Sequence, residues 1–304
     1  MGEKKHPHHP VNDVPELELL EEAKVSRLLD NPLESRFEAS GVCLQAGTAY
    51  VVFDNSTHLA RFTICAGRLS RTHDMRPLHS HFSGYEDIAY DPNTERFFML
   101  IEAEESTPGR YKARVEEYDR ELNFIASNWI DFLLKHRNKG MEGLACTRLD
   151  GETWLLALCE GNRCKGGAKG RRPGHGRIQL FSRGELEWAH RGTLKLPKSL
   201  RCEDYSALDL YQDRLLVASQ ASGLLWVGRL QAERMQLQDQ GRTYRFPTTR
   251  RHKPRYCNIE GVAWLTDDLI LAVSDKRKPG VQPKRCRRTD QSIHIFRIPD
   301  RIEY

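Results

Sequence analysis

The chain has 304 residues, of which 39% are hydrophobic and 29% are charged, and its formal net charge is +5. This composition excludes a collagen, a coiled coil and a wholly disordered chain, and it favours one large globular domain. No apolar run approaches the roughly 18 residues that a membrane helix needs, and residues 1–15 lack the apolar segment of a secretory signal. We therefore expect a cytoplasmic protein that has no membrane partner.

Eight cysteines are spread along the chain, and no CxxC pair occurs among them. Cys43, Cys146 and Cys159 stand inside apolar runs, where a buried thiol behaves as a small hydrophobic side chain. In a chain without a secretory signal, we expect the cysteines to be reduced thiols. Their spacing gives no support to a structural zinc site.

Five related segments follow one another along the chain. Each consists of a short apolar run, a tight turn carrying Gly, Asp or Asn, and a second apolar run, which is the pattern of a buried β-hairpin. A third strand-like run follows each hairpin, and helical periodicity is nearly absent. The hairpins lie at 37–55, 84–104, 140–162, 204–222 and 259–276, and the third runs lie at 58–64, 113–119, 176–182, 224–230 and 292–298.

The spacing of these repeats predicts a β-propeller. The residues that open the hairpins are Ser40, Glu86, Glu142, Ser206 and Glu260, which are separated by 46, 56, 64 and 54 residues. Such spacing suits four-stranded blades with loops of variable length. We predict an all-β fold with five blades. A sixth, degenerate blade between repeats 2 and 3 or repeats 3 and 4 is the alternative.

The last repeat ends after its third strand, at residues 292–298. A propeller closes its ring when one terminus completes the last blade, so the stretch 22–29 is expected to supply the missing strand. Residues 1–15 are then a flexible tail, and residues 16–304 form a single propeller domain.

The start of the first strand and the end of the second strand lie at the same face of every blade. Ten polar positions therefore meet around the axis, and seven of them are carboxylates. Carboxylates this close together require a compensating cation, and oxygen ligands favour calcium over zinc. The alternative is that these residues cap backbone amides at strand ends. The expected metal ligands are Glu86, Glu142, Glu260, Asp54, Glu102, Glu160 and Asp275.

Basic residues are concentrated in three loops, at 163–177, 250–255 and 276–288, which hold 17 of the 47 Lys and Arg residues. Topology is expected to place these loops around the acidic centre. A negative centre with a positive rim suits an anionic ligand, although loops of this composition can also be merely solvated. The expected ligand-binding residues are Arg171, Arg172, Lys276, Arg277 and Arg251.

Histidine is the natural general base near neutral pH, and His79 and His81 enter the second blade on this face. These two histidines and Glu142 are the candidate catalytic residues, while the alternative is that loop histidines are ordinary surface residues. The sequence contains no GxSxG elbow, Walker loop, HExxH motif or dinucleotide fingerprint. The corresponding enzyme classes are therefore disfavoured.

The repeats resemble a group of propeller families through the motifs EASGV at 38–42, YEDIAYDPNTERFF at 85–98, MEGLA at 141–145, DYSALDL at 204–210 and IEGVAW at 259–264. These families are the SdiA-regulated proteins, the phytase-associated esterase-like proteins and, more distantly, the calcium-dependent lactonases and phosphotriesterases. The resemblance implies axial calcium ligands and, in some relatives, hydrolysis of an ester, lactone or phosphoester. Ser40 and Ser206 depart from the motif, because they stand where it has Glu.

Two functions from different classes follow from these patterns. The first is a calcium-dependent hydrolase-like propeller that acts on or binds a small anionic ester or phosphoester at the axis. The second is a non-enzymatic platform for a partner protein or a polyanion. The basic loops lack the interleaved aromatic residues that stack bases, which disfavours nucleic acid as a partner. We expect a monomer.

Overall fold

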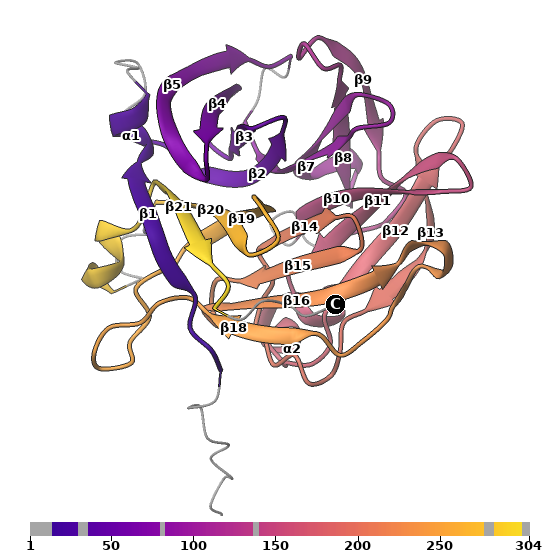
Figure 1. Ribbon diagram of the computed structural model, residues 1–304. Coiled ribbons are helices and arrows are strands. Elements are labelled where there is room, and N and C mark those ends of the chain that lie inside the picture. The colour runs from indigo at the N-terminus through magenta and orange to yellow at the C-terminus, as the bar shows by residue number, and fades with distance from the viewer. Residues whose placement is uncertain (1–13, 30–35, 80–82, 136–139, 277–282, 300–304) are drawn as a thin grey trace, which may run out of the picture.

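Five antiparallel sheets surround a common centre in the computed structural model, which describes residues 14–29, 36–79, 83–135, 140–276 and 283–299 (Figure 1). Each predicted hairpin forms the two innermost strands of one sheet. The five first strands contact one another in a closed ring. The predicted five-bladed, all-β propeller is therefore confirmed.

Blades 1 to 3 each follow the simple order of the chain, from the inner strand to the outer strand. Blade 1 contains β2 (Ala39–Gln45), β3 (Thr48–Phe53), β4 (His58–Cys65) and β5 (Arg68–Pro77). Blade 2 contains β6 (Tyr85–Asp91), β7 (Arg96–Thr107), β8 (Arg110–Tyr118) and β9 (Phe124–Trp129). Blade 3 contains β10 (Met141–Leu149), β11 (Glu152–Cys159), β12 (Arg177–Arg183) and β13 (Trp188–Lys195).

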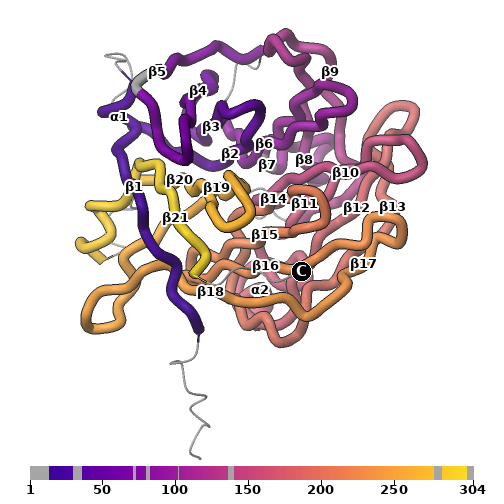
Figure 2. Tube along the Cα trace, viewed as in Figure 1, coloured from indigo at the N-terminus to yellow at the C-terminus, as the bar shows by residue number. Residues whose placement is uncertain are grey.

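Blade 4 has a divided outer edge, because two short strands pair with the same third strand. It contains β14 (Ala207–Tyr211), β15 (Arg214–Ser219), β16 (Leu224–Gln231), β17 (Gln236–Leu237) and β18 (Arg242–Arg245). Figure 2 follows the same trace and labels β6 and β17. The helical segments are short: α1 (Val25–Leu28), α2 (Gly167–Gly170) and the 3₁₀ turns Asn162–Cys164, Ala232–Arg234 and Lys284–Arg288.

Blade 5 joins the two ends of the chain and closes the ring. It contains β19 (Ile259–Trp264), β20 (Leu269–Ser274), β21 (Ser292–Arg297) and the N-terminal strand β1 (Glu18–Lys24), which pairs with β21 (Figure 1). The closing strand begins four residues before the predicted stretch 22–29. The chain turns into α1 after Lys24, because this turn buries Val25 and Leu29 in the core beside blade 1. The division into a tail at 1–15 and one domain at 16–304 stays a prediction.

The core consists of five clusters of buried apolar side chains, one between each pair of neighbouring blades. Burial of apolar surface therefore holds each blade to the next and closes the ring. Within the described residues, no helix is long and apolar enough to cross a bilayer.

Two disulfides correct the expectation of reduced thiols for four of the eight cysteines, whereas Cys43, Cys65, Cys146 and Cys202 are free. Cys159 is bonded to Cys164, and Cys257 is bonded to Cys286. The second bond joins the connection before β19 to the connection before β21, which are brought together only when blade 5 folds. Disulfides persist in oxidising compartments. The reduced state that was expected from a chain without a secretory signal is thus not found for these four cysteines, and the predicted cytoplasmic location stays a prediction.

Candidate functional site

The face at which the first strand of each blade begins is called the loop-rich face here, and the opposite face, with the turns between first and second strands, is the hairpin face. On the loop-rich face, the residues that open four hairpins each sit in a β-bulge. For example, β10 pairs with β11 through Met141 and Gly143 and skips Glu142. A bulge leaves one residue unpaired and re-aims its side chain. The skipped residues are Ser40, Glu86, Glu142 and Glu260.

The two serines among the opening positions tie neighbouring blades together. The Ser40 hydroxyl donates to the backbone oxygen of Tyr85 over 2.5 Å, and the Ser206 hydroxyl donates to that of Ile259 over 2.8 Å. Both serines are buried. Their role is therefore structural, which explains why blades 1 and 4 depart from the Glu of the motif.

Glu86, Glu142 and Glu260 are half-buried at equivalent positions of blades 2, 3 and 5. Bulge geometry and topology thus bring these three predicted ligands to one end of the ring. Each of the three residues already has an interaction partner within the chain.

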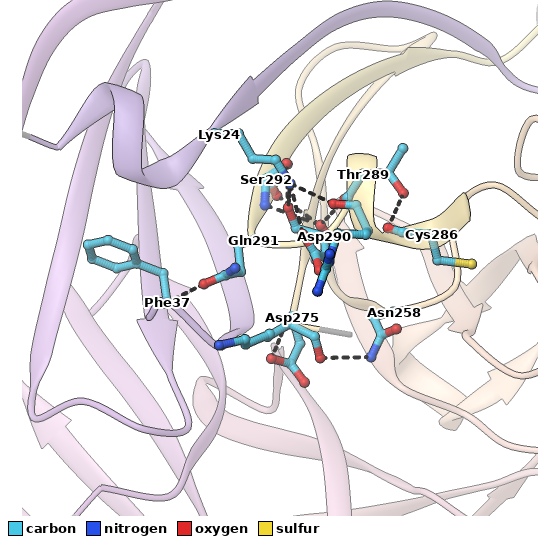
Figure 3. Close-up of polar contacts among 12 residues, drawn as sticks. Lys24, Phe37, Asn258, Asp275, Cys286, Thr289, Asp290, Gln291 and Ser292 are labelled. Atoms are coloured by element: carbon cyan, nitrogen blue, oxygen red, sulfur yellow. Dashed lines mark hydrogen bonds and ion pairs between the residues drawn. The ribbon is translucent and has the colours of Figure 1, made fainter. Parts of the chain in front are cut away.

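The closing positions do not behave as one group. Asp54 is exposed, whereas Glu160 and Asp275 are half-buried. The backbone N–H of Lys276 donates to Asp275 Oδ1, so Asp275 caps the chain where β20 ends (Figure 3). The side chain of Glu102 lies outside the described residues.

The predicted calcium ligands whose side chains the structure describes do not form a recognisable metal site. Among the side chains that the structure describes, no three His, Cys, Asp or Glu residues converge as a metal ion would require. Calcium normally takes six to eight oxygen ligands. The described side chains therefore do not by themselves provide a calcium site, and the predicted ligand set stays a prediction.

The basic segments lie on the loop-rich face, as topology predicts. Residues 160–176 connect β11 to β12, residues 246–258 connect β18 to β19, and residues 275–291 connect β20 to β21. Arg172 and Arg251 are exposed and Lys276 is half-buried. Arg277 lies outside the described residues.

The connection before β21 is anchored by polar contacts on both sides (Figure 3). Lys24 Nζ donates to Asp290 Oδ1 over 2.8 Å, which ties the connection to the closing strand β1. Gln291 Oε1 accepts from the backbone N–H of Phe37 over 3.0 Å, which ties it to blade 1. The described end of this basic segment is therefore held in place by the neighbouring blades.

The connection before β12 is held in place by hydrogen bonds to the side chain of Asn162. Asn162 is fully buried, and its amide donates to the backbone oxygens of Gly170 (2.9 Å), Cys202 (3.1 Å) and Glu203 (3.2 Å). Its Oδ1 accepts from the backbone N–H of His175 over 2.9 Å. One side chain thus joins both ends of the loop to the start of blade 4.

A cavity of about 270 Å³ opens beside this loop, between blades 3 and 4, and is called the blade 3–4 cavity. Two of its glycines are required by close packing, because a Cβ on Gly161 or Gly170 would lie 2.0 or 1.9 Å from the backbone oxygen of Lys165. The lining comprises Glu160, Gly161, Lys165, Gly166, Gly167, Gly170, Arg171, Glu203, Asp204 and Ala221. Glu160, which was predicted as a metal ligand, and Arg171, which was predicted to bind an anion, therefore line the same cavity.

Asp204 and Glu203 are the two acidic residues of this cavity that were not predicted from the sequence, and Asp204 is the more deeply buried of them. Burial raises the pKa of its carboxyl above the usual range, although a 2.6 Å hydrogen bond from the Ser219 hydroxyl lowers it. The carboxylates of Glu160 and Glu203 add to the upward shift. The available signal was its position two residues before Ser206, at the start of the fourth repeat.

His79 is separated from this cavity in the chain and in the fold. His79 is exposed, its ring stacks on Phe124 at 3.8 Å, and its backbone N–H donates to the Tyr118 hydroxyl over 3.0 Å. Phe124 belongs to β9, the outermost strand of blade 2. These contacts give His79 a packing role, and His81 lies outside the described residues.

No family model matches the chain, and no curated protein matches it. Among solved structures, a glutaminyl cyclase from Myxococcus xanthus is 11% identical, with a TM-score of 0.49 over 93% of this chain and 97% of that one. The calcium-binding protein regucalcin from Agrobacterium tumefaciens is 10% identical, with a TM-score of 0.49 over 92% and 94%.

A PQQ-bound aldose sugar dehydrogenase from Streptomyces coelicolor is 12% identical, with a TM-score of 0.48 over 92% of this chain and 97% of that one. Likenesses at this level say nothing about what this chain binds. Membership of the SdiA-regulated or phytase-associated families stays a prediction.

Proposed function

We propose that this propeller binds a small anionic ligand, such as the phosphoester of a polyol, in the blade 3–4 cavity. The observation that carries the proposal is the pairing of Lys165 and Arg171 with bare glycine backbone in one cavity. Guanidinium and ammonium groups form strong charge-assisted hydrogen bonds to phosphate and carboxylate oxygens. Open space lies where a side chain would stand on Gly167, so a ligand can approach the backbone closely at this point of the lining.

The acidic side chains of the cavity restrict the ligand further. Glu160, Glu203 and Asp204 also line the cavity, and they would repel a bare inorganic anion. A ligand that carries hydroxyl or amino groups beside its anionic group can donate hydrogen bonds to them. The mixed lining therefore favours a phosphorylated or carboxylated polyol over phosphate alone.

The sequence favoured a calcium-dependent hydrolase, and the described residues do not provide a calcium site. Ligand binding in the blade 3–4 cavity requires no metal and involves neither His79 nor Glu142, which do not line it. Turnover of the same ligands would be measured separately.

The test is calorimetric titration with glycerol 2-phosphate, glucose 6-phosphate and inorganic phosphate. Arg171→Gln should weaken binding of the sugar phosphate by about tenfold or more, because it removes a charged hydrogen-bond donor from the cavity. Arg172→Gln is the matched control, since Arg172 is the adjacent exposed residue and does not line the cavity. The control should change the affinity by less than about threefold.

The same pair of variants distinguishes the platform for a polyanion. If heparin binds and both substitutions weaken it equally, with a steep dependence on salt, the whole basic face is the site and the cavity is not. Absence of binding by all three phosphate compounds would contradict the proposal.

A further inference from the structure

The inner strands bring two more carboxylates to the propeller axis, in addition to the opening residues on the loop-rich face. The first residue after each opening position is Gly41, Asp87, Gly143, Ala207 or Gly261. Four of these are small because the strands approach closely: a Cβ on Gly261 would lie 3.0 Å from the Cα of Gly41. Asp87 is the one large side chain of this layer, and it is buried.

Two residues further along each strand, the equivalent layer contains Cys43, Ala89, Ala145, Asp209 and Ala263. Asp209 is the carboxylate of this second layer, which lies nearer to the hairpin face. Each of the two layers therefore carries one carboxylate among small side chains.

A cavity of about 580 Å³ opens on the hairpin face beside the second layer, and we call it the axial cavity. Asp209 lines it together with the thiols of Cys43 and Cys146 and the rings of Tyr90 and Trp264. Cavities that hold small organic ligands are typically of this volume, with mostly apolar walls and few polar groups. None of the predicted site residues belongs to it.

The carboxylates at the axis have backbone partners and no cationic partner among the described residues. Asp209 Oδ2 accepts from the backbone N–H of Trp264 over 2.7 Å. Asp87 accepts from the backbone N–H groups of Ile88 and Leu144 over 2.8 and 2.7 Å. Burial raises the pKa of Asp209 to about 6, as expected of a carboxylate that lacks a countercharge.

The other charged groups around the axial cavity are paired with one another. Arg148 lies 3.6 Å from Asp91, and Arg214 pairs with Asp267 at 2.8 Å while its guanidinium stacks on the ring of Trp264. Asp209 is thus the carboxylate of the cavity wall that a ligand would neutralise.

We infer that the axial cavity binds a small organic ammonium ion, whose charge is met by Asp209 and whose apolar part packs against the aromatic and thiol side chains. Cation–π attraction to aromatic rings adds to a carboxylate in recognising such a group. The cavity lies on the opposite face from the blade 3–4 cavity, so this inference does not depend on the proposed function.

The probe is 2-phenylethylamine, titrated calorimetrically at pH 7.5, and its neutral counterpart is 2-phenylethanol. Wild-type protein should bind the amine at least about tenfold more tightly than the alcohol, because only the amine forms a charged hydrogen bond. Asp209→Asn should remove this preference. Asp150→Asn is the matched control, since it removes an exposed carboxylate from a turn of the same face and should leave the affinity unchanged within about twofold.

A measurement on the unaltered protein keeps the inference testable if Asp209→Asn fails to fold. Between pH 7.5 and pH 5, affinity for the amine should fall as Asp209 takes up a proton, and binding at pH 6 should release protons, seen as a heat that depends on the buffer. Asp87, Cys43 and Cys146 lie near Asp209 on other strands, and Tyr90 and the paired Asp91 and Arg148 line the same cavity. Burial raises the pKa of the thiols and the phenol further above this range, and it also raises the pKa of Asp87, which does not line the cavity.

Three results would overturn the inference. They are equal affinity for the amine and the alcohol, equal loss in Asp209→Asn and Asp150→Asn, and displacement of the amine by millimolar sodium or calcium chloride at constant ionic strength. The last result would assign the cavity to an inorganic cation.

Discussion

Asn162 shows how much of the loop-rich face depends on one side chain. It sits fully buried and joins Gly170, His175 and the start of blade 4 through its amide. Buried polar groups of this kind cost little when every hydrogen bond is made and a great deal when a partner is removed.

We predict that Asn162→Ala lowers the free energy of unfolding by about 2–4 kcal/mol, because several buried backbone oxygens lose their donor. It should also weaken binding in the blade 3–4 cavity. Urea unfolding followed by circular dichroism measures the first effect. Asn123→Ala, which alters an exposed turn asparagine, is the control and should cost less than about 1 kcal/mol. Equal costs would show that the loop does not depend on Asn162.

Asp209 should make stability depend on pH in the direction opposite to that of a salt-bridged carboxylate. Its pKa is raised from 3.8 to about 6 in the folded state, so the folded protein holds its proton more tightly than the unfolded chain. Stability from this group is fully present below about pH 4 and is lost as pH rises to about 6, by about 3 kcal/mol.

Melting curves of wild-type protein and Asp209→Asn between pH 4 and pH 8 test this. The difference between the two proteins should shift in favour of the variant as pH rises to about 6 and then level off. A constant difference across this range would contradict the assignment.

At the scale of elements, β1 closes the ring by pairing with β21. It forms six registered pairs with β21, and Leu17 immediately before it is buried between blades 4 and 5. Without β1, the edge of β21 would be exposed to solvent and to pairing with other chains.

We expect removal of residues 1–24 to lower the free energy of unfolding by about 3–6 kcal/mol, from the lost ladder of hydrogen bonds and apolar burial. Removal of residues 1–13 should leave the melting temperature unchanged, in agreement with the tail predicted from the sequence. Thermal melting and size-exclusion chromatography of the two truncated proteins make the comparison. Equal melting temperatures would mean that the ring closes without β1.

At the scale of the whole molecule, strand order alone places the three basic connections and the opening glutamates at one face. Every second strand and every outer strand ends at the face where the first strands begin, so the connections after β11, β18 and β20 share a face with the bulges. A positive rim there should raise the association rate of anionic ligands at low salt.

Calcium should not stabilise the protein, because the described residues offer no set of ligands for it. A resident site at about a hundred times its dissociation constant would contribute about 2.7 kcal/mol, so its presence would be plain in a melting curve. We therefore expect the same melting temperature with calcium chloride and with EDTA. A rise with calcium that Glu142→Gln abolishes would restore the predicted metal site.

The number of blades, the extent of the hairpins and the face on which the charged loops lie were all predictable from the sequence. They follow from alternation, turn residues and strand order, which are local properties of the chain. The closing strand was predicted to begin four residues too late. After Lys24 the chain forms a helical turn because this turn buries Val25 and Leu29 against blade 1, and the local sequence does not show that packing.

The sites were decided by the tertiary structure. Asn162 meets Cys202 across 40 residues, Asp87 meets Leu144 across 57, and Cys257 pairs with Cys286 only after blade 5 has formed. Whether a carboxylate binds a cation, caps an amide or sits uncompensated at the axis depends on these distant neighbours. No local pattern encodes that choice, because the energy of a buried charge is set by the groups that surround it after folding.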